Sequence, residues 1–236
     1  MSKEEVKKFI STVFCNYCEE YKNVFSVFEP WAKYKHVPKS KSGDEFRFSI
    51  HECNQVVKFQ SVYKGRSDGV LTWIEFPIRY KEDKNKQDGT IHVDGIIVDR
   101  NREAIYFIEA KRLTKKQGFD YVANDIKRIM QHGKKDDLKD RLKAGYKFDG
   151  YTFYCLILAD FWREHNTIGK AYKTDKKSDG VIDWEGEVLS YIRDKVAKNP
   201  EVKTRSQLEL IAQSIVDIKD NDYHLAYALF ELPDFK

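Results

Sequence analysis

Several features that identify common protein classes are absent from this 236-residue chain. Its four cysteines, Cys15, Cys18, Cys53 and Cys155, are too few for a disulfide scaffold. The sequence has no run of 18 apolar residues and no charged-then-apolar N-terminal segment with a small-residue cleavage site. We therefore expect neither a membrane span nor a secretory signal, and these absences predict a cytoplasmic protein.

The signature motifs of several enzyme classes are missing as well. The chain has no G-x-S-x-G, no glycine-rich phosphate loop ending in Lys-Ser/Thr and no dinucleotide-binding fingerprint. His51 and Glu52 lack the second histidine of H-E-x-x-H, because position 55 is glutamine. Cys15 and Cys18 have C-x-x-C spacing, but they lie in a helical pattern without a second pair. They indicate two buried or half-buried thiols and not a zinc site.

Composition does not identify a partner. The chain has 42 basic and 38 acidic residues, and a net charge of +4 is too small by itself to indicate nucleic-acid binding. A content of 41% hydrophobic and 14% aromatic residues supports a substantial core. Function must therefore be sought in the placement of particular residues.

The most informative segment is 91–111. Two apolar, β-branched runs, 91–98 and 104–108, flank a polar turn, which is the composition of a β-hairpin. Residues equidistant from the centre of the turn lie opposite each other, and the midpoint between Asp94 and Glu109 falls inside it. We therefore expect the two carboxylates to face each other, with Cβ atoms about 4.5–5.5 Å apart.

Lys111 follows Glu109 by two residues and is therefore expected on the same face of the strand. Facing acids destabilise a strand pair unless something compensates their charge, and Mg²⁺ is typically held by one or two carboxylates and several waters. A solvated strand face with a cross-strand ion pair is the alternative interpretation. That alternative does not explain why two acids oppose each other at the ends of apolar runs.

The pattern of Asp94-Gly95 and Glu109-Ala110-Lys111, with fourteen residues between Asp94 and Glu109, resembles the PD-(D/E)XK phosphodiesterase superfamily, which includes many restriction endonucleases. The family's first acid often follows a proline, whereas Val93 precedes it here. The resemblance implies metal-dependent cleavage of DNA. It further implies that Asp94 and Glu109 bind Mg²⁺ or Mn²⁺, that the Ala110 carbonyl adds a ligand, and that Lys111 positions the attacking water.

The resemblance also implies the fold class, an α/β restriction-endonuclease-like core. Its expected order is a helix, a three-stranded antiparallel meander, a second helix and a fourth strand, in a mixed central sheet flanked by helices. We assign this core to 45–160, an N-terminal helical segment to 1–38, and C-terminal helices with a last strand to 161–236, all in one compact domain.

The first core helix of the family commonly supplies one more acid. Ser49 and Glu52 have the form of a capping box, so Glu52 is a candidate for this role and also for a purely capping role. The alternative is Glu75 in the first strand, which projects on the same face as Asp94 if the loop at 81–90 is centred near residue 85 or 86. The sequence leaves this choice open.

Apolar periodicity locates the remaining elements. It predicts helices at 6–21, 53–60, 122–130, 184–196 and 208–218, strands at 73–78, 151–159 and 223–232, an aromatic end of the first helix at 25–31 and a linker at 39–44. Basic side chains beside the second core helix are candidates for phosphate contacts, although a solvated face explains each of them equally well: Arg112, Lys115, Lys127 and Arg128.

Two functions follow as hypotheses. The first is a Mg²⁺-dependent deoxyribonuclease of restriction, defence or repair type, with DNA as partner, no membrane association and a homodimer as an open question. The alternative is a catalytically silent nucleic-acid-binding or assembly module with the same fold. Two opposed acids beside a lysine favour the enzyme.

Overall fold

The computed structural model describes residues 2–32, 52–80, 89–113, 116–132, 150–162, 184–198, 208–219 and 223–232. Eleven elements lie in these ranges: α1 (Lys3–Ala32), α2 (Glu52–Lys64), β1 (Val70–Tyr80), β2 (Gly89–Asp99), β3 (Ala104–Arg112), α3 (Lys116–His132), β4 (Thr152–Trp162), the π-helical η2 (Trp184–Leu189), α6 (Ser190–Ala197), β5 (Glu209–Lys219) and β6 (Tyr223–Glu231). The expected linker at 39–44 and residues 81–88 of the loop expected at 81–90 lie outside the described residues, whereas residues 89–90 belong to β2.

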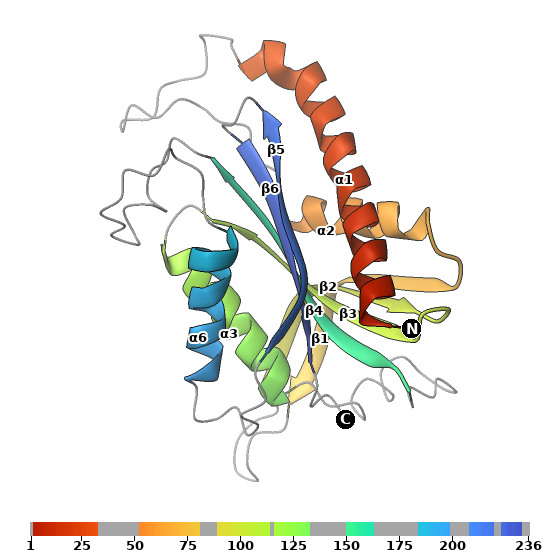
Figure 1. The fold of residues 1–236 in the computed structure, drawn as a ribbon, viewed down its shortest axis with the longest axis vertical. Helices are drawn as coiled ribbons and strands as arrows, with labels where there is room; N and C mark the ends of the chain where they lie inside the picture. Colours follow the sequence, from red (N-terminus) through yellow and green to blue (C-terminus); the bar gives the residue numbers. More distant parts are fainter. Residues whose placement is uncertain are drawn as a thin grey trace.

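The strands form one mixed sheet in the order β1-β2-β3-β4-β6-β5 (Figure 1). β1, β2 and β3 are an antiparallel meander, β4 pairs parallel to β3, and β6 pairs antiparallel to both β4 and β5. Because α3 lies between β3 and β4 in the chain, it makes the crossover that a parallel pair requires. The α/β class and the order helix, meander, helix, fourth strand are therefore confirmed among the described residues of 52–162.

Helices cover both faces of the sheet, with α1 and α2 on one side and α3 and α6 on the other (Figure 1). On the first side, the ring of Phe14 in α1 lies 4.6 Å from that of Tyr227 in β6. On the second, the Trp184 indole of η2 donates a hydrogen bond of 3.0 Å to the Tyr227 carbonyl. β3 and β4 are buried on both faces, as their continuous apolar runs predict.

The segment 208–218 is a strand, so the prediction of a helix there is wrong. Its apolar residues are spaced by three and four positions, which imitates a helix, but β5 has irregularities between Leu210 and Ala212 and between Asp217 and Lys219. Each irregularity shifts the alternation of faces along a strand. Beyond β4, the described residues thus form one helical segment and two strands, and not two helices and a strand.

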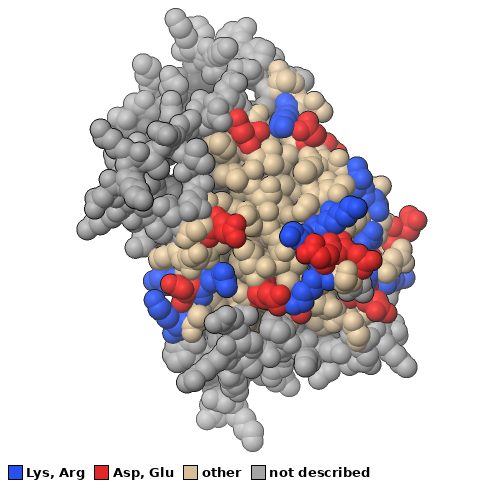
Figure 2. Space-filling model, in the orientation of Figure 1, with Lys and Arg blue, Asp and Glu red and all other residues tan. Residues whose placement is uncertain are grey.

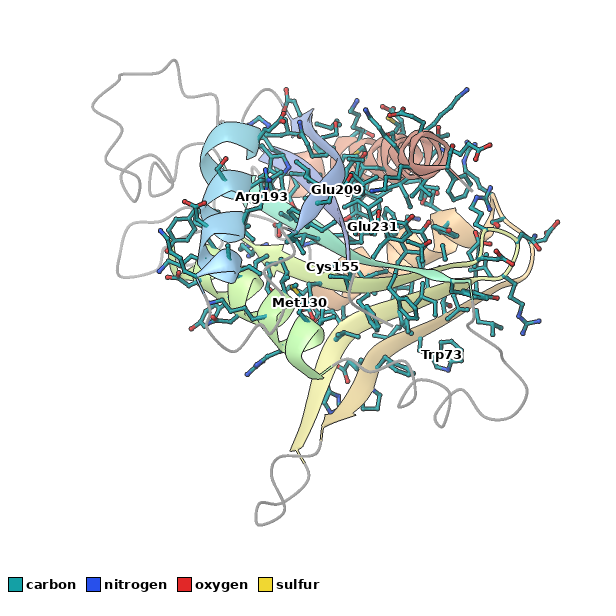
Figure 3. The ribbon with its side chains drawn as sticks, turned by 60° about the horizontal axis from the view of Figure 1, so that its bottom comes forward. Trp73, Met130, Cys155, Arg193, Glu209 and Glu231 are labelled. Carbon is teal, nitrogen blue, oxygen red and sulfur yellow. The ribbon has the colours of Figure 1, made fainter. Side chains whose placement is uncertain are left out.

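Two expectations for the first helix also need correction. α1 continues to Ala32 and does not end in the aromatic segment 25–31; its one proline, Pro30, lies in the last turn. Cys18 is buried as expected, but Cys15 is exposed. Lys3 joins the start of α1 to the sheet, because its Nζ lies 2.5 Å from Glu209 Oε2 and 3.0 Å from Glu231 Oε2, and Figure 3 shows these two glutamates on neighbouring strands. No helix within the described ranges is long and apolar enough to cross a membrane.

Candidate active site

The β2–β3 hairpin has the predicted register. Asp99 pairs with Ala104 and Gly95 pairs with Ile108, and continuing this register by one residue brings Asp94 opposite Glu109. The ladder itself ends at Gly95, whereas β3 continues its pairing with β4 to Arg112. The Asp94 carboxylate takes the place of the missing strand partner, because its Oδ2 accepts a hydrogen bond of 2.7 Å from the Ala110 N–H. The first acid thus sits where β2 leaves β3.

α2 packs closely on the hairpin beside this departure. A Cβ at Gly95 would lie 2.4 Å from Val56 Cγ1 and 2.9 Å from Gln60 Nε2, so only glycine lets α2 approach β2 this closely. The Gln60 amide donates to the carbonyl of Trp73, at 2.8 Å, and to that of Ile96, at 3.2 Å. α2 therefore holds both β1 and β2 immediately beside Asp94. The Trp73 side chain itself points away from α1 and α2 (Figure 3).

Lys111 connects the acids at this point. Its Nζ lies 3.4 Å from Asp94 Oδ2 and 3.6 Å from Glu109 Oε2, on the side of the sheet that α3 covers. A third carboxylate comes from α3, with Asp125 Oδ2 at 3.6 Å from the same nitrogen. We call these four residues, Asp94, Glu109, Lys111 and Asp125, the Lys111 cluster. It brings together all three residues that the sequence predicted as the centre of the site.

The cluster is largely shielded from water. The side chain of Glu109 is only 3% exposed, and those of Lys111 and Asp125 are 18% and 17% exposed. Burial raises the pKa of Glu109 well above its ordinary value, and Asp94 and Asp125 raise it further. Burial lowers the pKa of Lys111, but the surrounding carboxylates outweigh it and the net shift is upward. The site therefore has an excess of negative charge that a single ammonium does not cancel.

Asp125 was missed by sequence reasoning. The candidates predicted on this helix were Lys127 and Arg128, whereas Asp125 lies at the border of the apolar stripe between Val122 and Ile126. Burial raises the pKa of Asp125, although Lys111 and Arg128 lower it. An acid at the edge of an apolar helical stripe is the signal that would have suggested it.

The two candidates for a further acid occupy different environments. Glu52 is the first residue of α2, and its charge contributes to the raised pKa of Lys111 after those of the three nearer carboxylates. Glu75 falls opposite Asp94 in the β1–β2 register, but its backbone has a φ of 51° and its side chain is exposed. Ser49 lies outside the described residues, so the capping role of Glu52 stays a prediction.

The predicted phosphate-binding residues are not grouped as expected. The Arg112 guanidinium projects to the other face of the sheet, where its NH2 lies 3.2 Å from Oδ2 of the fully buried Asp160. Tyr223 donates to the same Oδ2 at 2.9 Å and Gln55 donates to Oδ1 at 2.8 Å, so Arg112 belongs to a buried polar network. The structure therefore does not support Arg112 as a phosphate-binding residue, because Asp160 already binds its guanidinium.

The other basic candidates lie on or before α3. Arg128 is 58% exposed and contacts Asp125 Oδ1 at 3.3 Å, and Lys127 is half-buried. Lys115 lies outside the described residues. On the face shown in Figure 2, the described basic and acidic side chains are interspersed. The charges of the described residues therefore do not mark a nucleic-acid surface on that face.

The donor set fits one hard divalent cation. Within the described part of the chain, no group of three or more His, Cys, Asp or Glu side chains is arranged to hold a metal ion. Mg²⁺ does not require such a group, since one or two carboxylates and several waters are its usual ligands. Asp94 and Glu109 supply two carboxylates, and the Ala110 carbonyl points to the same side of β3 as its N–H, toward Asp94. These donors leave positions open for water and substrate.

No family model, curated protein or solved structure matches this chain, and its function must therefore be argued from the Lys111 cluster itself.

Proposed function

We propose that this chain is a metal-dependent nuclease of the PD-(D/E)XK type that hydrolyses DNA phosphodiester bonds. The single observation that carries the proposal is the meeting of two facing carboxylates and a lysine where β2 leaves β3. Lys111 Nζ lies 3.4 Å from Asp94 and 3.6 Å from Glu109 there, beside an open end of the hairpin. The order of α2, the β1–β2–β3 meander, α3 and β4 supports the same family.

Three residues of the Lys111 cluster and one backbone carbonyl have chemical roles in this proposal. Asp94, Glu109 and the Ala110 carbonyl hold Mg²⁺ or Mn²⁺, which supplies Lewis-acid activation of water and phosphate oxygen. Lys111 holds the attacking water and offsets charge that develops on the phosphate. The buried setting strengthens these interactions, because charges interact more strongly away from bulk water.

A catalytically silent binding module is the alternative, and one observation favours it. Lys111 already contacts all three carboxylates of the cluster, so the acids have a structural role without any metal. A structural network of this kind also perturbs pKa values. Turnover therefore has to be measured.

The deciding experiment incubates the purified chain with supercoiled, linear and single-stranded DNA, and with RNA, in Mg²⁺, Mn²⁺ or EDTA. We expect nicking or linearisation of DNA that requires the divalent cation. Glu109→Gln is the inactive reference, and Asp120→Asn on the exposed part of α3 is the matched active control. Binding of DNA by the wild type without any cleavage would support the silent module, and cleavage in EDTA would refute the metal-dependent mechanism.

A further inference from the structure

Lys111 has anionic partners on two different elements of the fold. Asp94 and Glu109 come from the sheet, whereas Asp125 comes from α3 and approaches the ammonium with its Oδ2 at 3.6 Å. We propose that Asp125 is a positioning residue that anchors Lys111 when Asp94 and Glu109 hold the metal. This inference rests on the proposed function and adds a residue that acts through Lys111.

The need for an anchor follows from charge. A divalent cation held by Asp94 and Glu109 draws their negative charge to itself and repels a nearby ammonium. The two sheet carboxylates then no longer compensate Lys111 as they do without the cation. Asp125 is the remaining carboxylate in ion-pair contact with Lys111 among the described residues. It can therefore keep the ammonium beside the metal site.

The position of Asp125 is held by packing. Its neighbours on the apolar stripe of α3, Val122 and Ile126, are fully buried in the core on this side of the sheet. The carboxylate itself is 17% exposed and therefore only partly screened by water. A charge fixed in this way restricts where the flexible lysine side chain can lie.

Both oxygens of Asp125 already have cationic partners. Oδ2 faces Lys111, and Oδ1 lies 3.3 Å from NH1 of Arg128. A carboxylate engaged by two cations is a poor ligand for a third, so this arrangement favours an anchor over a metal ligand. The two roles predict different effects of substitution on metal binding.

The first test replaces Asp125 by Asn and measures cleavage and Mg²⁺ binding separately. We expect kcat to fall by about 10- to 100-fold, the range for partners that orient functional groups, with a Mg²⁺ shift of Tm that is smaller than in the wild type but larger than in Glu109→Gln. Asp125→Glu should recover part of the rate, because it keeps the charge at a longer reach. Asp120→Asn is the matched control on the same helix, since Asp120 contacts Lys195 and Tyr191 instead, and it should cleave like the wild type.

The second test does not depend on cleavage. Tm is measured for the wild type, Asp125→Asn, Lys111→Ala and the double variant, in EDTA and in Mg²⁺. The coupling between the two residues is the part of the Tm change in the double variant that the two single changes do not account for. It should be larger in Mg²⁺, where Asp125 is the principal partner of Lys111, than in EDTA, where three carboxylates share Lys111. In cleavage assays, Asp125→Asn should add no further loss to Lys111→Ala.

Three results would refute the role of Asp125 as an anchor for Lys111. The first is a loss of Mg²⁺ binding in Asp125→Asn that is as large as in Glu109→Gln. The second is a wild-type cleavage rate in Asp125→Asn while Lys111→Ala is inactive, and the third is a thermal coupling that is the same with and without Mg²⁺. A wild-type protein that cleaves no nucleic acid would refute the proposed function, and the thermal coupling would still decide the role of Asp125.

Discussion

Glu109→Gln tests the electrostatic argument most directly. The side chain is 3% exposed and lies with two other carboxylates around one ammonium. When all four groups are ionised, the cluster has a net charge of about −2. Glutamine has the same shape and can still accept a hydrogen bond from Lys111, but it removes one of the repelling charges. In metal-free buffer, at a pH above the folded-state pKa of Glu109, the variant should therefore be more stable than the wild type.

The size of the effect can be worked out for both conditions. Removing the buried charge should raise the free energy of unfolding in EDTA by roughly 1–2 kcal/mol, or about 2–8 °C in Tm for a chain of this size. At a free Mg²⁺ concentration about ten times Kd, binding stabilises the wild type by roughly 1.4 kcal/mol, or about 3–6 °C. The variant should lose most of this second shift.

The pH dependence has a definite sign. Because burial and neighbouring carboxylates raise the pKa of Glu109 in the folded state, the folded chain binds its proton more tightly than the unfolded chain does. The stability that this proton binding contributes is fully present below the pKa of Glu109 in the unfolded chain, and it is lost as the pH rises through the pKa of Glu109 in the folded chain. Metal-free wild type should thus lose stability over this window, and Glu109→Gln should lose less.

The assay is thermal unfolding in EDTA and in Mg²⁺ across this pH range, with Asp120→Asn as the control for charge removal on the surface. A Glu109→Gln protein that melts below the wild type in EDTA would refute the repulsion argument. An undiminished Mg²⁺ shift in the variant would show that Glu109 is not a ligand.

Three further substitutions test other parts of the site. Lys111→Ala should abolish DNA cleavage but leave the Mg²⁺ shift of Tm in place, and Lys111→Arg should not restore the rate, because a planar guanidinium replaces a compact ammonium; wild-type cleavage by Lys111→Ala would make Lys111 a structural residue. Gly95→Ala should destabilise the chain by about 1–3 kcal/mol in chemical denaturation, since its Cβ would overlap Val56 of α2, and an unchanged midpoint would contradict this packing. Glu52→Gln should lower kcat strongly, with stability changed by well under about 1 kcal/mol, if Glu52 serves the site; a fully active Glu52→Gln makes Glu75→Gln the next variant to assay.

The centre of the site was predictable because it depends on local geometry. A short polar turn sets the register of an antiparallel hairpin, and strand alternation then places Lys111 on the face of Glu109. The observed pairing of Gly95 with Ile108 has this register. The register of the hairpin does not predict the point at which β2 leaves β3. This point lies at Gly95, where α2 packs closely on β2.

Local sequence patterns could not predict the contact of Asp125 with Lys111 or the strand β5, for different reasons. The contact between Asp125 and Lys111 requires the rotation of α3 about its axis and its position over the sheet, which are properties of tertiary packing. In β5, two irregularities change the face on which successive residues lie, so the apolar spacing of 208–218 takes on a helical period. The buried partner of Arg112 was hidden because Asp160 lies 48 residues later, near the end of an otherwise apolar strand.

Lys111 and Arg112 are adjacent cations that face opposite sides of the sheet, one toward Asp125 and the other toward Asp160. If β3 formed one residue out of step with its neighbours, Arg112 would replace Lys111 beside Asp125, and Glu109 would turn to the other face of the sheet, at the position that Ile108 holds opposite Leu156. Such a mispaired chain would bury the Glu109 carboxylate among apolar side chains and would take the Arg112 guanidinium away from Asp160. The charges at the end of β3 therefore disfavour a slipped register, so the same few charges that we assign to chemistry also help to specify the alignment of the strand.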